Sequence, residues 1–142
     1  MSAEENKALY RQWIEEVFNK RQTDRIGDFV ASDIVEHTPN FQSGLEGARQ
    51  GVGVFLTAFP DLRVTVEEVV AEGDRLVARL SASGTQKGSF QGIPPTGREM
   101  TVTGMDMWRV AGGKCAEHWL EMDSLGMLQQ LGVIPQPEQA RG

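Results

Sequence analysis

Residues 101–123 read TVTGMDMWRVAGGKCAEHWLEMD, and this stretch decides the fold. Apolar and polar residues alternate on both sides of Ala111-Gly112-Gly113, which is the pattern of two antiparallel strands joined by a tight turn. A loop of three residues with glycine in last place suits a type I turn closed by a glycine bulge. The pattern therefore predicts a long β-hairpin centred on this turn.

The length of the loop sets the register of the hairpin. Three loop residues place Val110 opposite Lys114 and, further along the strands, Asp106 opposite His118. Two loop residues would place Asp106 opposite Trp119 and mix charged residues onto the apolar face, so the pattern favours three. The face shared with Asp106 and His118 then carries Val102, Gly104, Trp108, Ala116, Leu120 and Met122. The sequence thus predicts a carboxylate and an imidazole at directly opposed positions, with Cβ atoms about 5 Å apart.

Composition limits the class of protein. At 142 residues the chain has the length of one domain, which we place at residues 1–134, with a disordered tail at 135–142. Fourteen Lys and Arg against twenty Asp and Glu give a net charge of -6, which argues against nucleic acid or an anionic membrane as partner. No apolar run approaches the roughly 20 residues of a membrane span, and the first residues are acidic, unlike a basic leader. We therefore expect a cytoplasmic protein.

The remaining segments predict helices at the front and strands behind them. Capping boxes at Ser2 with Glu5 and at Ser43 with Glu46 open two amphipathic helices, whose apolar stripes place Tyr10 and Phe55 in the core. The predicted helices cover 3–19, a short segment from 23 or 24, the segment between 43 and 60, and 124–131; the predicted strands cover 34–38, 62–66, 76–82 and the segment from 98 into the hairpin. This order describes an α+β domain in which helices wrap a curved antiparallel sheet and leave a cone-shaped space for a ligand.

Short motifs spread over residues 7–134 point to a known family. They are Gly88-x-Phe90-x-Gly92-Ile93-Pro94-Pro95-Thr96-Gly97-Arg98, then Gly113-Lys114 followed by Glu117-His118-Trp119, Asp123, and Gly126 through Gln130-Leu131-Gly132. Through these motifs the chain resembles the SnoaL-like polyketide cyclase family, within the nuclear-transport-factor-2-like superfamily of cone-shaped α+β barrels. The resemblance implies an enzyme without a cofactor, because characterised members close the last ring of anthracycline precursors by an intramolecular aldol step.

The resemblance also bears on the catalytic positions. Aligned on these motifs, such cyclases use an aspartate two residues after the motif histidine and a second histidine on the preceding strand. These two positions hold Leu120 and Asp106 here, whereas His118 matches the motif histidine. The resemblance therefore implies that the cyclase aspartate is not retained at its usual position, while Asp106 could restore a carboxylate to the same wall from the neighbouring strand.

Asp106 and His118 are the predicted catalytic residues. A carboxylate on an apolar wall is poorly hydrated and is therefore a useful base, while His118 would orient it, shuttle a proton or donate a hydrogen bond. The alternative is that Asp106 only satisfies His118 or Arg109 as a buried polar group. His37, near Pro39, is expected at the cavity mouth; together with Asp106 and His118 it could form a two-His-one-carboxylate set, but the spacing requires no metal and we expect none. The other residues expected to contact a substrate are Trp13, Phe41, Phe59, Phe90, Trp108, Leu120 and Met122.

Two functions from different classes follow. The first is cofactor-independent acid–base chemistry on a hydrophobic carbonyl compound, by aldol-type cyclisation or isomerisation, as in a lyase or isomerase. The second is a non-catalytic protein that binds a hydrophobic small molecule in the same cavity. Epoxide hydrolysis is a third possibility within the superfamily, but it would need an organised pair of acids around an arginine, which the sequence does not indicate.

The opposite face of the hairpin carries large apolar residues, which suggests a covered surface. They are Met105, Met107 and Trp119, and because relatives in the superfamily often associate through their sheets, we expect a homodimer that buries them. Cys115, the single cysteine, can form no internal disulfide. The predicted register places it on the face opposite His118, as a small packing residue.

Overall fold

The computed structural model describes residues 1–136, and the part of the predicted tail at 137–142 lies outside the described residues. Its strands form one sheet in the order β1-β5-β4-β3-β2, made of Val30–Glu36 (β1), Arg63–Glu72 (β2), Arg75–Thr85 (β3), Glu99–Ala111 (β4) and Lys114–Met122 (β5). Strands β2 to β5 pair antiparallel, as predicted, but β1 runs parallel to β5. The expectation of a purely antiparallel sheet is therefore wrong at this edge, where a strand from the front of the chain joins the hairpin.

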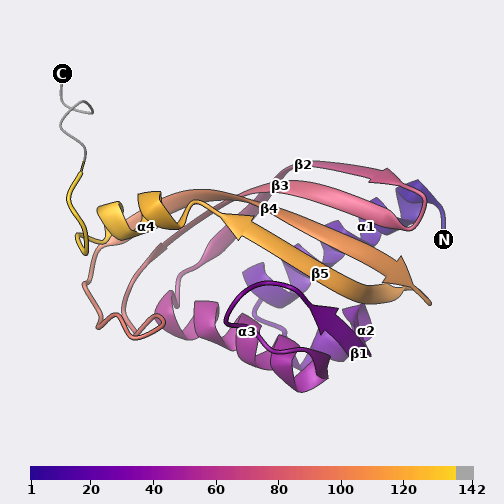
Figure 1. Ribbon diagram of the computed structural model, residues 1–142, viewed down its shortest axis with the longest axis horizontal. Helices are drawn as coiled ribbons and strands as arrows, with labels where there is room; N and C mark the ends of the chain where they lie inside the picture. The colour runs from indigo at the N-terminus through magenta and orange to yellow at the C-terminus, as the bar shows by residue number, and fades with distance from the viewer. Residues whose placement is uncertain (137–142) are drawn as a thin grey trace.

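The helices lie mainly on the concave side of the curved sheet (Figure 1). They are Ala3–Trp13 (α1), which continues as a π-helical turn at Ile14–Asn19 (η1), a 3₁₀ turn at Thr23–Arg25 (η2), Ile26–Phe29 (α2), Gly44–Ala58 (α3) and Ser124–Gln130 (α4). The first predicted helix thus has the right extent. Helix α3 packs against β1, and α1 packs against β2 and β3, so the helices close over the sheet. Among the described residues, no helix combines the length and the apolar character needed to cross a membrane.

The two predicted capping boxes have different outcomes. The Ser2 hydroxyl accepts the Glu5 N–H at 3.1 Å and the Glu5 carboxylate accepts the Ser2 N–H at 2.9 Å, which confirms the first box. At the second, the Ser43 side chain makes no cap bond to its helix. Its hydroxyl instead accepts the backbone N–H of Glu36 at 2.9 Å. This bond ties the start of α3 to the end of β1 and so helps to fix the strand that carries Glu36.

The hairpin turn is shorter than predicted. Ala111 pairs with Lys114, and the two loop residues, Gly112 and Gly113, have φ of 59° and 75°. Positive φ at both central residues is the requirement of a type I′ turn, which only glycine meets without strain. Because Ala116 then forms a bulge on β5, the shorter loop and the extra residue together shift the register by two positions.

Because of this shift, Asp106 and His118 are not directly opposite each other, but their side chains still lie on the same face of the hairpin. Asp106 pairs with Leu120, and His118 pairs with Trp108. The predicted direct pairing is therefore wrong, whereas the predicted shared face holds because side chains alternate with a period of two. Cys115 precedes the bulge, so it points inward, 1% exposed, and not to the opposite face as predicted.

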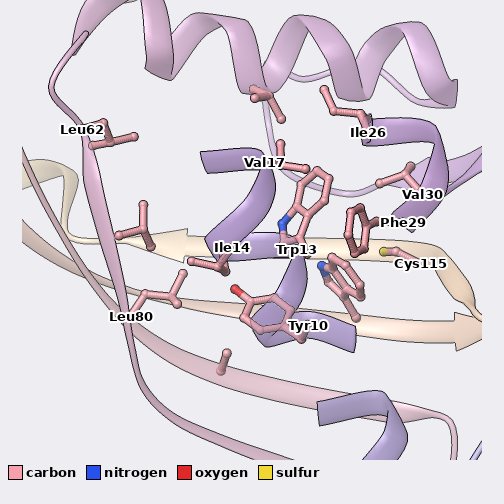
Figure 2. Packing of buried hydrophobic residues seen from close by; sticks show 14 of the residues in the cluster. Tyr10, Trp13, Ile14, Val17, Ile26, Phe29, Val30, Leu62, Leu80 and Cys115 are labelled. Atoms are coloured by element: carbon pink, nitrogen blue, oxygen red, sulfur yellow. The ribbon is translucent and has the colours of Figure 1, made fainter. Parts of the chain in front are cut away.

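Aromatic side chains fill the space between α1 and the sheet. Figure 2 shows Tyr10 and Trp13 on successive turns of the first helix, with Phe29 and Cys115 close by. Trp13 packs edge-on against Phe29 and Trp108, with ring centroids 5.9 Å and 5.7 Å away. Tyr10 meets Trp108 in the same way at 5.1 Å. These contacts hold the inner face of β4 against α1, which positions Asp106 between them.

The outer face of the hairpin carries the predicted apolar residues. Met105 is 51% exposed, and Met107 and Trp119 are partly exposed beside it. The Trp119 ring stacks on the ring of His37, with centroids 4.6 Å apart, and the guanidinium of Arg75 lies 5.6 Å from the Trp119 centroid. Large side chains therefore cluster on this face of the sheet.

Candidate active site

Three neighbouring strands bring together one imidazole and two carboxylates. His118 Nε2 lies 2.5 Å from Asp106 Oδ1, across a diagonal of the hairpin. On the other side of the ring, His118 Nδ1 lies 2.7 Å and 2.9 Å from the two carboxylate oxygens of Glu36. Glu36 is the parallel-strand partner of His118, so the order β1-β5-β4 fixes the order Glu36, His118, Asp106. We call these three residues the acid–histidine–acid triad.

Further hydrogen bonds hold both ends of the triad. The Tyr10 hydroxyl donates to Asp106 Oδ2 at 2.7 Å, and Tyr10 itself is fully buried. The backbone N–H of Thr38 donates to Glu36 Oε2 at 3.0 Å. Because buried carboxylates are costly unless they are hydrogen-bonded, these donors stabilise the triad as well as fix its orientation.

The triad occupies one wall of a cavity between the sheet and the helices. The cavity has a volume of about 150 Å³, and Glu36, Asp106 and His118 are among its lining residues. Thr38, Thr103 and Cys115 also line it, and most of the remaining wall is apolar. A cluster of charges beside apolar walls is the arrangement expected of a small-molecule site, because it orients one polar part of an otherwise hydrophobic ligand.

The two carboxylates decide the protonation state of His118. Burial by itself would lower the pKa of the imidazole, but Asp106 and then Glu36 outweigh burial and raise it to about 10. Burial likewise would raise the pKa of Glu36, but the hydrogen bond and charge of His118 leave it below its ordinary value. At neutral pH His118 is therefore an imidazolium that donates one N–H to each carboxylate.

Two other titratable groups near the triad stay protonated. Burial, followed by the charge of Asp106, raises the pKa of Tyr10 well above its ordinary value. Burial, followed by the charges of Asp106 and Glu36, also raises the pKa of the Cys115 thiol. Neither group is therefore a base or a nucleophile near neutral pH.

Most of the predicted contact residues lie on the cavity wall, and three do not. Trp13, Phe41, Trp108, Leu120 and Met122 line the cavity together with Asp106 and His118. Phe59 and Phe90 lie outside its lining, where they pack on each other with ring centroids 5.7 Å apart. Phe59 is 0% exposed and Phe90 is 6% exposed, and both belong to the hydrophobic core.

His37 is the third exception, because it lies on the outer face of the sheet. Its Nε2 lies 2.8 Å from Glu117 Oε2, and its ring stacks on Trp119. Strand alternation is the physical reason: Ile34, Glu36 and Thr38 face inward, so His37 between them faces outward. The expected position of His37 at the cavity mouth is therefore wrong, and it does not join Asp106 and His118.

The prediction missed Glu36, Tyr10 and Phe55. The same alternation, started from the apolar residue Ile34, would have placed Glu36 inside. The apolar stripe of α1 predicts Tyr10 in the core, but the hydrogen bond from Tyr10 to Asp106 depends on how α1 packs against β4. Phe55, which lines the cavity beside Phe41, was predicted only as a core residue of the third helix.

Comparisons with known proteins show which family the chain is similar to. A family model described as SnoaL-like polyketide cyclase matches residues 8–131. The aklanonic acid methyl ester cyclase DauD of Streptomyces sp. (strain C5) is 30% identical over 138 residues, covering 92% of this chain and 84% of that protein. The nogalonic acid methyl ester cyclase of Streptomyces nogalater is 30% identical over 122 residues, covering 81% and 89%.

Among solved structures, TsrD from Streptomyces laurentii has a closely similar fold. Its TM-score is 0.86 at 30% sequence identity, and the alignment covers 94% of this chain and 99% of that one. The similarity therefore extends over nearly the whole length of both chains.

Proposed function

Because this chain belongs to the SnoaL-like polyketide cyclase family, we propose that it catalyses an aldol-type ring closure on a hydrophobic carbonyl compound held in its cavity. The acid–histidine–acid triad on the cavity wall is the observation that carries this proposal. Two cyclases similar to this chain in sequence are named for methyl esters of aklanonic and nogalonic acid, which suggests a polyketide ester as the substrate class.

Asp106 is the proposed base. It lines the cavity, is 6% exposed, and has its two oxygens fixed by Tyr10 and His118. In an aldol closure the base takes a proton from the carbon next to a carbonyl, and the resulting enolate carbon bonds to a second carbonyl carbon. A positioned base of this kind contributes roughly 10²–10⁴ in rate.

His118 is proposed to hold this base in place. Both N–H groups of the imidazolium donate hydrogen bonds to carboxylates, so the ring fixes the orientation of Asp106. Glu36 compensates the charge of the imidazolium, so that Asp106 does not face an unbalanced cation. Such preorganisation reduces the movement that the site must make during the reaction.

The replacement of the usual cyclase aspartate by Leu120 fits this assignment. Leu120 is the strand partner of Asp106, and both line the cavity. The carboxylate therefore stands one strand away from the family position but on the same wall. We propose that the ring being closed lies beside these two residues, since about 150 Å³ matches a single benzene-sized group.

The test is to incubate the purified protein with aklanonic and nogalonic acid methyl esters in D₂O. Chromatography would follow ring closure, and mass spectrometry would follow exchange of the protons next to the carbonyl groups. The wild type is expected to catalyse both, and Asp106→Asn is expected to lower both by roughly 10²–10⁴. The variant Glu117→Gln, which alters a carboxylate on the outer face, serves as the matched control. Absence of both reactions with both esters in the wild type would contradict the proposal.

A second candidate function is binding without turnover. The observation that favours it is Leu120 at the position where the cyclases use their aspartate. In that case the same esters would quench the fluorescence of Trp13 and Trp108, which line the cavity, while neither exchange nor ring closure occurred. One assay with the same esters therefore distinguishes the two functions, because only an enzyme would exchange the protons or close the ring.

A further inference from the structure

Glu36 is a second carboxylate on the cavity wall, and its surroundings resemble those of Asp106. Its side chain is 11% exposed and lines the cavity, and both of its oxygens lie within hydrogen-bond distance of His118 Nδ1. Orientation of the imidazole would not require this charge, because a backbone carbonyl can accept an N–H equally well. Since a buried charge carries a desolvation cost, an ionised group facing a cavity is a candidate for a functional role.

The His118 ring connects the two carboxylates in a continuous line of hydrogen bonds. Asp106 Oδ1 meets Nε2 at 2.5 Å, and Glu36 Oε1 meets Nδ1 at 2.7 Å. An imidazolium can release its Nδ1 proton while it keeps the proton on Nε2. His118 and Glu36 therefore have the geometry for proton transfer from Nδ1 to the carboxylate, across the neighbouring strands β5 and β1.

We infer that Glu36 is the second acid–base group of this site, and that it relays a proton from His118 Nδ1 to the substrate. The inference rests on the proposed ring closure, which needs a base at one atom of the substrate and an acid at another. Asp106 would take the proton from carbon, and Glu36 would deliver a proton to the alkoxide formed at the second carbonyl.

The relay conserves protons and charge at every step. The C–H bond breaks toward Asp106, its electron pair forms the enolate, and the enolate carbon bonds to the second carbonyl carbon, whose oxygen becomes an alkoxide. The Nδ1 proton of His118 then moves to Glu36, which gives a proton to the alkoxide; His118 is left neutral with its remaining proton on Nε2. Asp106 releases its proton to water and Nδ1 takes one up from water, which restores the starting state. The product is an isomer of the substrate, and no oxidant or metal takes part.

The electrostatics of Glu36 support this role. Its pKa lies below the ordinary value, because the bond and charge of His118 outweigh burial, so it rests as a carboxylate and readily gives up a proton that it receives. Once protonated it is a strong acid toward an alkoxide. The neighbouring Tyr10 hydroxyl and Cys115 thiol are held protonated, and so they do not compete for the proton.

The test compares proton exchange with ring closure in Glu36→Gln, using aklanonic acid methyl ester as the probe. Loss of Glu36 leaves the base in place, so ring closure should fall roughly 10²-fold further than proton exchange in D₂O. Asp106→Asn should lose both reactions, and Glu117→Gln should lose neither. Ring closure within about threefold of the wild type in Glu36→Gln would overturn the relay, as would an equal loss of both reactions in a variant that is shown by circular dichroism to be folded.

A measurement on the wild type alone makes the inference independent of how the variant folds. The rate of ring closure is measured in mixtures of H₂O and D₂O. A relay that moves two or more protons together predicts a curved dependence on the deuterium fraction, and a linear dependence would overturn it. If the wild type closes no ring and exchanges no proton, the proposed function fails and the relay with it; if it reacts with a linear dependence, only the relay fails.

Discussion

Glu36 and His118 are register partners on adjacent parallel strands, although 82 residues separate them in the chain, and both Glu36 oxygens lie within 2.9 Å of His118 Nδ1. This pair joins the front of the chain to the hairpin at the cavity wall. Together with Asp106 on the other side of the ring, it fixes His118 in its charged form. The stability and the chemistry of the site therefore depend on the same three side chains.

Stability should decrease with pH above neutrality. The pKa of His118 is about 10 in the folded protein and about 6.5 when unfolded, so its stabilising contribution is complete below pH 6.5 and is lost as pH rises toward 10. We expect the free energy of unfolding to fall by up to about 1.4 kcal/mol per pH unit in this window. Urea denaturation between pH 6 and 9 measures this decline.

The exposed histidine provides the control for that experiment. His37→Gln removes the histidine on the outer face and should leave the decline in place. A free energy of unfolding that stays constant from pH 6.5 to 9, or a decline that disappears in His37→Gln, would contradict the assignment of the effect to His118.

Tyr10→Phe should destabilise the protein through Asp106. The hydroxyl is buried and donates to Asp106 Oδ2 at 2.7 Å, and a hydrogen bond to a charged group contributes about 1.5–3 kcal/mol. Urea denaturation of Tyr10→Phe, Asp106→Asn and the double variant gives the coupling energy. Additive losses would show that the two side chains do not interact.

Two glycines of α3 should respond oppositely to alanine. A Cβ at Gly47 would lie 2.0 Å from the Gln42 carbonyl oxygen, so Gly47→Ala should cost about 1–3 kcal/mol through the shift that it forces. A Cβ at Gly53 meets nothing within 4 Å, so Gly53→Ala should be neutral or stabilise the helix by up to about 1 kcal/mol. Thermal unfolding of both variants tests how closely α3 approaches the preceding loop. An equal change in stability in the two variants would contradict the close contact of Gly47 with Gln42.

We propose that the outer sheet face forms a homodimer, since Met105, Met107 and Trp119 cluster there and Met105 is 51% exposed. Sedimentation at micromolar concentration should give twice the chain mass of 15.7 kDa. Met105→Asp should shift the protein toward the monomer, because it places a charge in the apolar contact. A wild-type mass of one chain would contradict the dimer.

The fold was predictable where sequence patterns are local. Period-two alternation in the hairpin, the capping box at Ser2 and the apolar stripe of α1 each depend on neighbouring residues, and each prediction agrees with the structure. The parallel pairing of β1 with β5 was not predictable, because it joins segments more than 80 residues apart. Its hydrogen bonds depend on how the helices return the chain to the sheet.

The site was predictable only in part for the same reason. Asp106 and His118 belong to one hairpin, and an even register error left them on the same face. Glu36 and Tyr10 reach the site from other elements, so their contacts appear only in three dimensions. Cys115 was misplaced because a bulge inverts the alternation within the strand, and residue type alone does not indicate a bulge at Ala116.

The titration of His118 by NMR tests the central claim most directly, since the claim is that two carboxylates hold this ring as a cation on the cavity wall. The ring resonances are followed from pH 5 to 10 in the wild type and in Asp106→Asn. The account predicts a wild-type pKa of about 10 and a lower pKa in Asp106→Asn, still above 6.5 because Glu36 remains. A wild-type pKa near 6.5, unchanged by the substitution, would contradict the triad and the chemistry proposed from it.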